Sequence, residues 1–369
     1  MPGKSKKNPL ILGFALFFMI IALSSLVKIN QQGTFEEPEY RELPCQPFLS
    51  VAGPEHFLVS RSGKLLISSQ DRQAAVYDQS WPQGAILLAD PTTPHTPPRN
   101  LTKEFRGEFH PRGISLFEDE SGQTLFVVNY LTGGFSIEIF SFDGDFLIHK
   151  NSVKSKSLVQ PGNIAARDHH SFYVMNEHGL FTASGHFIEE FLGLKASHVL
   201  YHDGHEFKKA VENLRLGYGI FFDKTSSQLF VTDMKEKTIS VFDHRDPSLT
   251  ATLKHSLKMD THPAGIAANK SGEGLLVTAH PQLLQANSHM LDPRQVASPS
   301  QVISMDLTLS KTEELMLSQK SGTSAASCVR EVSDSLILGG AFDNHMTICS
   351  LLAPALSTTT EQGSSIGTL

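Results

Sequence analysis

The stretch that decides the fold is His110-Pro111-Arg112-Gly113-Ile114, because a phrase of the same form returns three more times along the chain. The other copies end on Asn163-Ile164, Gly219-Ile220 and Gly265-Ile266, so that the isoleucines are 50, 56 and 46 residues apart. Each copy is followed by a polar break and a short apolar run, such as Leu125-Phe126-Val127-Val128. A self-similar unit of roughly 40 to 50 residues built from short strands is typical of a β-propeller.

Two further copies flank this array, at Gly53–Val59 and at Ala325–Val329, and give six units that begin near residues 53, 110, 160, 215, 262 and 323. The apolar runs are short, rich in β-branched and aromatic residues, and bounded by Gly, Ser, Asn or Asp, as strands and hairpins are. A β-sandwich is the alternative, but it gives no reason for Gly-Ile to recur at this period. The sequence therefore predicts an all-β, six-bladed propeller over residues 45–352, with almost no helix inside it.

The N-terminus is a different kind of segment. Residues 8–27 carry no charge, and Lys4, Lys6 and Lys7 precede them. About 20 apolar residues are enough to cross a bilayer as a helix, and the lysines predict a cytoplasmic N-terminus. We expect a cytoplasmic tail over 1–7, a transmembrane signal anchor over 8–28 that binds the lipid bilayer, and a linker over 29–44. A cleaved signal peptide is the alternative.

Both interpretations place the propeller outside the cytosol, in a lumenal, periplasmic or extracellular space. The polar residues 353–369 are predicted to be disordered. The net charge of −7 and the lack of a Lys/Arg stripe argue against nucleic acid as a partner. The chain contains no Gly-x-Ser-x-Gly, His-Glu-x-x-His or Cys-x-x-Cys motif, which disfavours a conventional serine or zinc hydrolase.

The chain has three cysteines, at positions 45, 328 and 349. Cys45 precedes the first unit and Cys349 ends the last, and in a closed ring the first and last blades are neighbours. A Cys45–Cys349 disulfide would close the ring, and an extracytoplasmic location favours it. Cys328 is then a buried free thiol. The alternative is that all three cysteines are reduced and buried.

Several of these phrases together resemble the paraoxonase/arylesterase family, whose relatives include the gluconolactonase propellers. The resemblance runs from about Glu42 to Leu351, and its most specific parts are Phe109–Ser115, Leu125–Asn129 and Phe172–His178. It implies a six-bladed propeller with calcium in its central channel, which hydrolyses lactones and aryl esters. An uncleaved apolar N-terminus and a disulfide between the ends of the propeller are also implied.

The implied calcium site can be checked against the residues. Calcium takes six to eight oxygen ligands, and the resemblance assigns the first of them to Glu55. Asn163 offers a neutral oxygen where the family has a carboxylate, and Tyr218 stands where the family has an amide. Other implied ligand positions hold residues without a suitable oxygen, namely His56, Gly162, Ala264 and Gly265. We therefore expect a vestigial calcium site at Glu55 and Asn163, absent or severely weakened. The two implied catalytic histidines are replaced by Tyr130 and Ser155.

The remaining polar residues suggest what the channel does instead. We expect seven side chains to gather at one mouth of the channel: Glu55, His56, Arg112, Tyr130, Asn163, His178 and Tyr218. In an ester or lactone hydrolase with altered chemistry, Glu55 or His178 is the general base, and Tyr130 or Arg112 stabilises the oxyanion. In the alternative, Glu55 and Arg112 form a polar plug, and the propeller binds a protein or small molecule at the membrane surface without catalysis.

Overall fold

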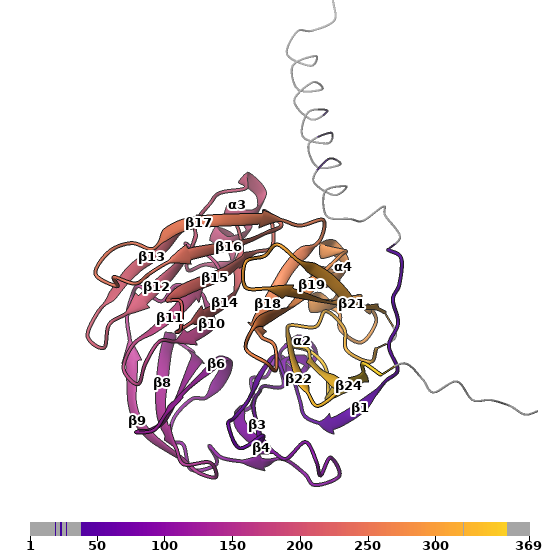
Figure 1. Ribbon diagram of the computed structural model, residues 1–369, viewed down its shortest axis with the longest axis horizontal. Helices are drawn as coiled ribbons and strands as arrows, with labels where there is room; N and C mark the ends of the chain where they lie inside the picture. The colour runs from indigo at the N-terminus through magenta and orange to yellow at the C-terminus, as the bar shows by residue number, and fades with distance from the viewer. Residues whose placement is uncertain (1–18, 20–22, 24–26, 28–37, 320, 353–369) are drawn as a thin grey trace, which may run out of the picture.

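The computed structural model describes Met19, Leu23, Val27 and residues 38–319 and 321–352. Residues 45–350 form a six-bladed β-propeller (Figure 1). Each blade is a four-stranded antiparallel sheet, and the blades surround one central axis. The predicted all-β, six-bladed propeller is confirmed. The predicted segments 1–7, 8–28 and 353–369 lie outside the described residues, apart from the three single residues named first. Among the residues that are described, no helix is long and apolar enough to span a membrane.

In blades 1 to 5 the strands follow one another in chain order from the channel outward, and in blade 6 the outermost strand is β1. Blades 1 and 2 contain β2 (His56–Val59), β3 (Leu65–Ser69), β4 (Ala85–Ala89), β5 (Arg99–Asn100), β6 (His110–Asp119), β7 (Gly122–Leu131), β8 (Gly134–Phe142) and β9 (Leu147–Lys154). Blades 3 and 4 contain β10 (Pro161–Ala166), β11 (Phe172–Asn176), β12 (Ser197–His202), β13 (Phe207–Leu214), β14 (Gly217–Asp223), β15 (Gln228–Asp233), β16 (Thr238–Asp243) and β17 (Thr252–Lys258). Blades 5 and 6 contain β18 (His262–Ala268), β19 (Gly274–His280), β20 (Ser300–Asp306), β21 (Thr312–Ser318), β22 (Cys328–Val332), β23 (Ser335–Gly339), β24 (His345–Ser350) and β1 (Cys45–Ser50).

The ring is closed by the first strand of the chain. β1 pairs with β24 and is the outermost strand of blade 6, so both ends of the propeller meet in one sheet. Cys45 lies directly opposite Cys349 in this pairing, and the two form a disulfide, as predicted. Cys328 is a buried free thiol.

The repeated sequence phrase marks the place where the inner strands of neighbouring blades touch. In blades 2 to 5 the pairing of the first two strands shifts register within this phrase, as at a β-bulge. A Cβ on Gly219 would lie 2.2 Å from the carbonyl oxygen of Ala264 in the next blade, and one on Gly265 would lie 2.1 Å from that of Ser327. Glycine recurs there because a side chain would push two blades apart.

In blades 4 and 5, threonine hydroxyl groups satisfy the backbone that the bulge leaves unpaired. Thr232 Oγ1 accepts a hydrogen bond from Gly219 N at 2.7 Å and donates one to the carbonyl of Ala264, also at 2.7 Å. In the next blade Thr278 Oγ1 accepts a hydrogen bond from Gly265 N at 2.9 Å. Adjacent blades are therefore joined by polar contacts around the channel as well as by apolar packing.

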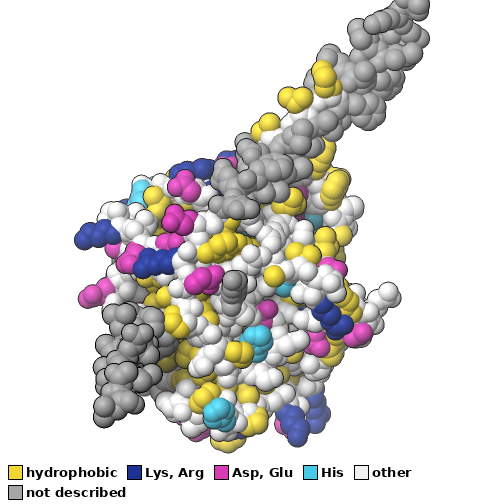
Figure 2. Space-filling view, turned by 90° about the vertical axis from the view of Figure 1, so that its right-hand side faces the viewer, with side chains coloured by type: hydrophobic (Ala, Val, Ile, Leu, Met, Phe, Trp, Pro, Cys, Tyr) yellow, Lys and Arg dark blue, Asp and Glu magenta, His cyan; other side chains and the backbone are white. Residues whose placement is uncertain are grey.

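The hydrophobic core consists of layers between neighbouring blades. One layer joins Phe126 and Val128 of blade 2 to Phe172 and Val174 of blade 3, and all four side chains are fully buried. The apolar runs that the sequence placed in strands supply these layers. On the side face shown in Figure 2, hydrophobic, acidic and basic side chains are interspersed.

Three short helices, which sequence periodicity did not reveal, connect the second and third strands of blades 1, 3 and 5. They are α2 (Arg72–Tyr77), α3 (Ala183–Leu192) and α4 (Leu283–Leu291). Asp71 caps α2 and Thr182 caps α3, each by accepting a backbone hydrogen bond in the first turn. The helices are too short for a periodic pattern to stand out, and α3 also exposes several apolar residues, which blurs its polar face.

Candidate functional site

The six inner strands run between two cavities, one at each end of the central channel. The residues at the starts of these strands, including Glu55, Arg112 and Tyr218, line a cavity of about 690 Å³, the Glu55 cavity. The residues at the ends of the same strands line a second cavity of about 650 Å³, the Arg330 cavity. Helices α3 and α4 give the Glu55 cavity apolar walls, and α2 contributes the charged side chain of Arg72.

The floor of the Glu55 cavity is organised by the guanidinium group of Arg112. Its Nε and Nη2 donate to Glu55 at 3.2 and 2.8 Å, and its Nη1 and Nη2 each donate to Glu177 at 3.1 Å. Nη1 also donates to the hydroxyl of Tyr130 at 2.7 Å. An arginine side chain has five N–H groups, and all five of Arg112 are used here. The pairing of Glu55 with Arg112 expected from the sequence is therefore present.

Glu55 has a second cation beside it, because Arg72 at the start of α2 also forms an ion pair with its carboxylate. Burial alone raises the pKa of Glu55, but Arg112 and Arg72 outweigh burial and lower this pKa to about 2. The carboxylate is therefore ionised and held on both sides by guanidinium groups. Burial raises the pKa of Tyr130 to about 12, so its phenol keeps its proton at neutral pH.

The residues around Glu55 do not fit the calcium ion that the sequence resemblance implies. Calcium needs six to eight oxygen ligands, whereas both oxygens of Glu55 face arginine side chains. Asn163 uses its amide nitrogen to donate to the carbonyl of Tyr218 at 3.0 Å. Within residues 38–319 and 321–352, no three His, Cys, Asp or Glu side chains gather as a metal site. The positive charge at this hub comes from Arg112 and Arg72.

His178 lies in the wall of the same cavity and is paired with a carboxylate from α3. Its Nδ1 lies 3.0 Å from Glu189 Oε2, and both side chains are buried. His186, one α3 turn before Glu189, stacks on the imidazole with ring centroids 4.0 Å apart. A carboxylate at Nδ1 places the proton there, and Nε2, the basic nitrogen of that tautomer, lies 3.8 Å from Glu190 Oε1.

The structure brings together five of the seven residues expected at one mouth. Glu55, Arg112, Tyr130, His178 and Tyr218 line the Glu55 cavity. The other two expectations are wrong. His56 follows Glu55 directly, but successive residues of a strand point to opposite sides, and it lines the Arg330 cavity. Asn163 lines neither cavity, because its side chain bridges to the neighbouring inner strand.

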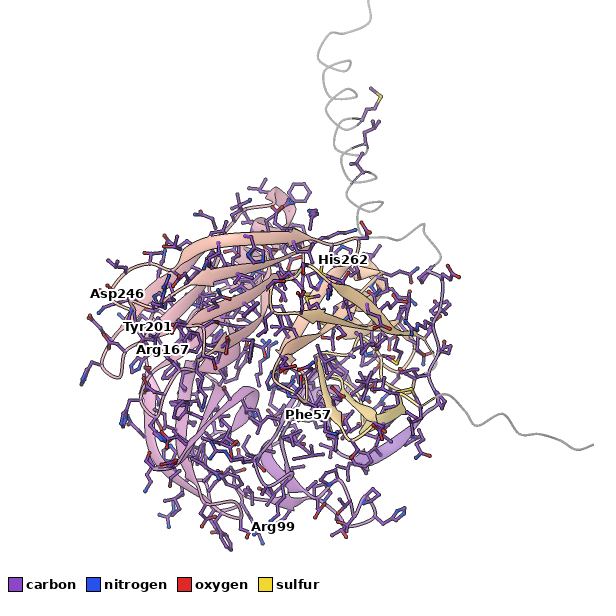
Figure 3. The ribbon with its side chains drawn as sticks, viewed as in Figure 1. Phe57, Arg99, Arg167, Tyr201, Asp246 and His262 are labelled. Atoms are coloured by element: carbon purple, nitrogen blue, oxygen red, sulfur yellow. A yellow bond between two sulfur atoms is a disulfide. The ribbon has the colours of Figure 1, made fainter. Side chains whose placement is uncertain are left out.

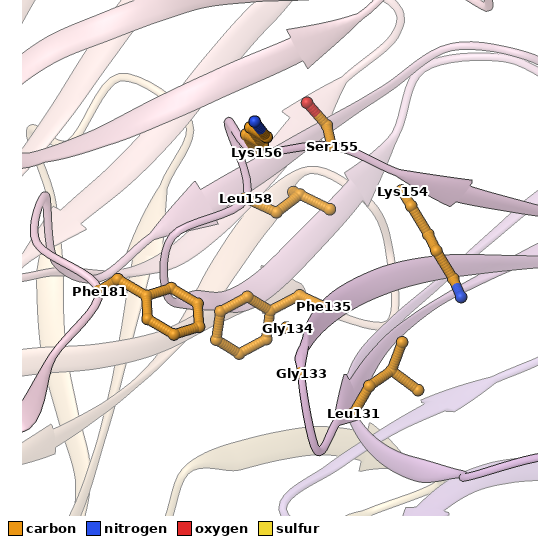
Figure 4. Close-up of a pocket in the computed structure, with 9 residues that line it drawn as sticks. All are labelled: Leu131, Gly133, Gly134, Phe135, Lys154, Ser155, Lys156, Leu158 and Phe181. Atoms are coloured by element: carbon orange, nitrogen blue, oxygen red, sulfur yellow. The ribbon is translucent and has the colours of Figure 1, made fainter.

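Ser155, which stands where the family has a histidine, lies in a separate pocket. Figure 4 shows this pocket, in which Phe135 and Phe181 face each other and Lys154, Ser155 and Lys156 form another side. Ser155 is not among the residues that line the Glu55 cavity. It therefore takes no part in the candidate site.

Sequence reasoning missed three residues of the site: Arg72, Glu177 and Glu189. Glu177 directly precedes His178 in a phrase that was already singled out, so its proximity to the channel was readable. Arg72 and Glu189 belong to helices that the sequence did not predict. Nothing in the local sequence marks them as channel residues.

Three buried histidines predict a strong pH dependence of stability. Burial, together with Arg330, lowers the pKa of His56 to about 3, and burial lowers those of His262 and His280 to about 4. The unfolded chain takes up these protons near pH 6.5 and the folded protein does not, so the stabilisation is complete above that pH and is lost as the pH falls. We expect the unfolding free energy to drop by about 1 kcal/mol per pH unit for each histidine between pH 6 and pH 4.

Thermal melts between pH 4 and pH 8 check this expectation. His280→Gln removes one of these groups and should lower the slope by about 1 kcal/mol per pH unit, whereas the exposed His205→Gln should leave it unchanged. A melting temperature that stays constant from pH 6.5 to pH 4 would contradict the burial argument.

Comparisons with known proteins agree on one family. The family model described as Arylesterase matches residues 81–351. Serum paraoxonase/arylesterase 2 of Bos taurus is 26% identical over 276 residues, which cover 73% of this chain and 77% of the relative. The same protein of Canis lupus familiaris is 28% identical over 204 residues, or 54% of this chain and 57% of the relative.

Solved structures support the fold alone. A gluconolactonase from Xanthomonas campestris superposes with a TM-score of 0.51 at 14% identity, covering 84% of this chain and 90% of that one. The major allergen Mala s 1 of Malassezia sympodialis gives a TM-score of 0.53 at 13% identity, covering 84% and 96%.

Proposed function

This chain belongs to the arylesterase family, and from that premise we propose that its Glu55 cavity hydrolyses small esters or lactones without calcium, with His178 as the general base. The observation that carries the proposal is the Glu189–His178 pair in the wall of an apolar cavity. A histidine oriented by a buried carboxylate is a recurrent general base in ester hydrolysis.

The proposed chemistry uses two side chains. His178 Nε2 takes a proton from a water molecule as its oxygen attacks the ester carbonyl. The hydroxyl of Tyr130, which accepts a hydrogen bond from Arg112, donates its own proton in a hydrogen bond to the carbonyl oxygen as negative charge develops there. His178 then returns its proton to the leaving alkoxide, and the acid and alcohol groups are released.

The hydrogen bonds favour His178 and Tyr130 over the other two residues that the sequence offered for these roles. Glu55 is a poor base because its pKa lies near 2 and both its oxygens face guanidinium groups. Arg112 is a poor oxyanion donor because its N–H groups are all engaged. We therefore assign the role of general base to His178 and that of oxyanion donor to Tyr130.

A second candidate function is binding without catalysis, and the closed network around Arg112 favours it. A cavity floor whose charges already neutralise one another holds no preformed site for the charge of a transition state. The apolar walls from α3 and α4 suit a small amphipathic ligand in either case.

We also propose that the propeller is tethered to a membrane and faces a compartment outside the cytosol. Two observations support this: the uncharged residues 8–27 after three lysines, and the Cys45–Cys349 disulfide, which persists in oxidising compartments. Alkaline extraction of membranes that contain the full chain tests it, because a tethered protein stays in the membrane pellet.

The hydrolase proposal is tested by turnover of an aryl acetate and a small lactone in the presence of a chelator. We expect His178→Gln to lower kcat/KM by about 10²- to 10⁴-fold, the usual contribution of a general base. His205→Gln, an exposed histidine outside the cavity, is the matched control and should keep full activity. Turnover that needs calcium, or that survives His178→Gln, would overturn the mechanism.

Ligand binding has its own readout in this protein. Trp81 is the single tryptophan of the chain and lines the Glu55 cavity, so its fluorescence reports occupancy there. A fluorescence change with a hydrolysis-resistant lactone analogue, without turnover of any ester, would favour the binding function over the hydrolase. Absence of both turnover and binding would reject the cavity as the functional site.

A further inference from the structure

The Arg330 cavity, at the other end of the channel, collects positive charge from five of the six blades. Its cations follow the first strand of a blade or belong to it: Arg61 follows β2, Arg167 follows β10, Lys224 follows β14, Lys270 follows β18, and Arg330 lies on β22. The chain has a net charge of −7, so a cavity lined by five cations is opposite in sign to the chain as a whole.

None of these five side chains forms an ion pair within residues 38–319 and 321–352. Arg330 donates to the carbonyl of Val329 at 2.7 Å and lies 5.8 Å from the ring centre of Phe57. Lys224 lies 5.6 Å from the ring centre of Phe117. Their charges are supported by carbonyls and aromatic rings and are not neutralised.

Arg167 follows the same pattern. Its Nη1 donates to the hydroxyl of Tyr173 at 2.7 Å and to the carbonyl of His244 at 2.8 Å. Its guanidinium carbon lies 5.8 Å from the ring centre of Tyr201, and Figure 3 shows the two residues side by side in blade 3. Neutral acceptors fix the position of this cation and leave its charge for another partner.

The carboxylates of the cavity are committed to backbone groups. Glu118 accepts hydrogen bonds from the backbone N–H of Arg61, Asp223 from that of Thr225, and Glu331 from that of Lys270. Five cations against three carboxylates leave two positive charges in excess. His56 adds no charge at neutral pH, because its pKa lies near 3.

We propose that the Arg330 cavity is a binding site for a small, multiply charged anion of phosphate or polycarboxylate chemistry. The cations surround a hollow of about 650 Å³, large enough for such a molecule and its hydration water. These cations come from separate blades, so one anion can contact several of them at once. Several cations together bind a multiply charged anion more strongly than a single surface cation does. Because they border a hollow inside the ring of strands, the occupant is a free anion and not a lipid headgroup. This site is independent of the ester chemistry at the other end of the channel.

The test is calorimetric titration of the full chain with tripolyphosphate and with citrate at constant ionic strength. We expect saturable binding of one anion per chain, weakened about three- to tenfold by Lys224→Gln and by Lys270→Gln. Both lysines are exposed, so both variants should fold normally. The matched control is Lys103→Gln, an exposed lysine outside the cavity, which should bind with unchanged affinity.

Two further measurements test whether the anion binds in the Arg330 cavity and whether a lipid surface can replace it. The fluorescence of Trp81 should stay unchanged on titration, because Trp81 lines the opposite cavity. Vesicles that contain phosphatidylserine serve as the lipid comparison. Absence of saturable binding, equal weakening by Lys103→Gln, or binding to the vesicles without binding of tripolyphosphate would each overturn the proposal.

Discussion

Replacing Arg112 by methionine is expected to lower the unfolding free energy by about 3–5 kcal/mol, because it removes one partner of a buried ion-pair network. Glu177 forms its ion pair with Arg112, and Glu55 would keep only Arg72. Methionine fills a similar volume, so the loss measures charge and hydrogen bonding more than packing. Chemical denaturation of the variant and the unaltered protein at pH 7 gives the difference directly.

Two variants control for this result. Arg245→Met removes an arginine whose partner, Asp243, pairs with it at the surface, and should change stability little. Glu177→Gln combined with Arg112→Met removes the orphaned carboxylate and should recover part of the loss. If Arg112→Met is no more harmful than Arg245→Met, the network does not hold the hub together.

The same network predicts how the protein responds to calcium. With guanidinium groups beside Glu55, a millimolar chelator should leave the melting temperature unchanged, and added calcium should not raise it. A rise of several degrees with calcium would show that the hub binds the ion despite Arg112. That result would also reopen a calcium-dependent mechanism for the Glu55 cavity.

Removing the disulfide is expected to cost about 6 kcal/mol, the loop-closure entropy of a crosslink over a sequence separation of 304 residues. Cys45 and Cys349 join the first strand of the propeller to its last blade, so without the bond β1 is held by its pairing with β24 and by the packing of Leu49 in the core. The Cys45→Ser and Cys349→Ser double variant should melt well below the oxidised protein.

Reduction of the unaltered protein gives the matched comparison, because the described residues hold this one disulfide and Cys328 is free. A reductant should lower the melting temperature of the unaltered protein toward that of the double variant and leave the variant where it is. Equal melting temperatures for the oxidised and reduced protein would mean that β1 stays in place without the bond.

The repeat could be recognised in the sequence because the same contact between inner strands of neighbouring blades is made many times. Gly219 and Gly265 recur at nearly the period of a blade, since each lies where two inner strands leave no room for a side chain. The closing disulfide could be predicted for a related reason, because ring closure places the first and last blades side by side whatever their sequences. The three helices could not, because their sequences are short and differ from blade to blade.

The candidate site was only partly readable. Glu55 and Arg112 begin the inner strands of their blades, so the repeat predicted that both would lie at one mouth of the channel, and their pairing was one of two interpretations. Their other partners, Arg72 and Glu177, come from the connection after β3 and from the end of β11, and no repeating pattern places them. The error over His56 arose because a one-residue step along a strand reverses the direction of a side chain.

The sequence by itself determined the six-bladed ring, its closure by Cys45 and Cys349, and the position of Glu55 and Arg112 at one mouth of the channel, because each follows from a contact that repeats or from the ends of a circle. Only the tertiary structure decided which charges neutralise one another, which histidine is paired with a carboxylate, and that the far end of the channel gathers unpaired cations. Those properties depend on side chains from different blades that converge within a few ångströms, and sequence distance carries no record of such convergence.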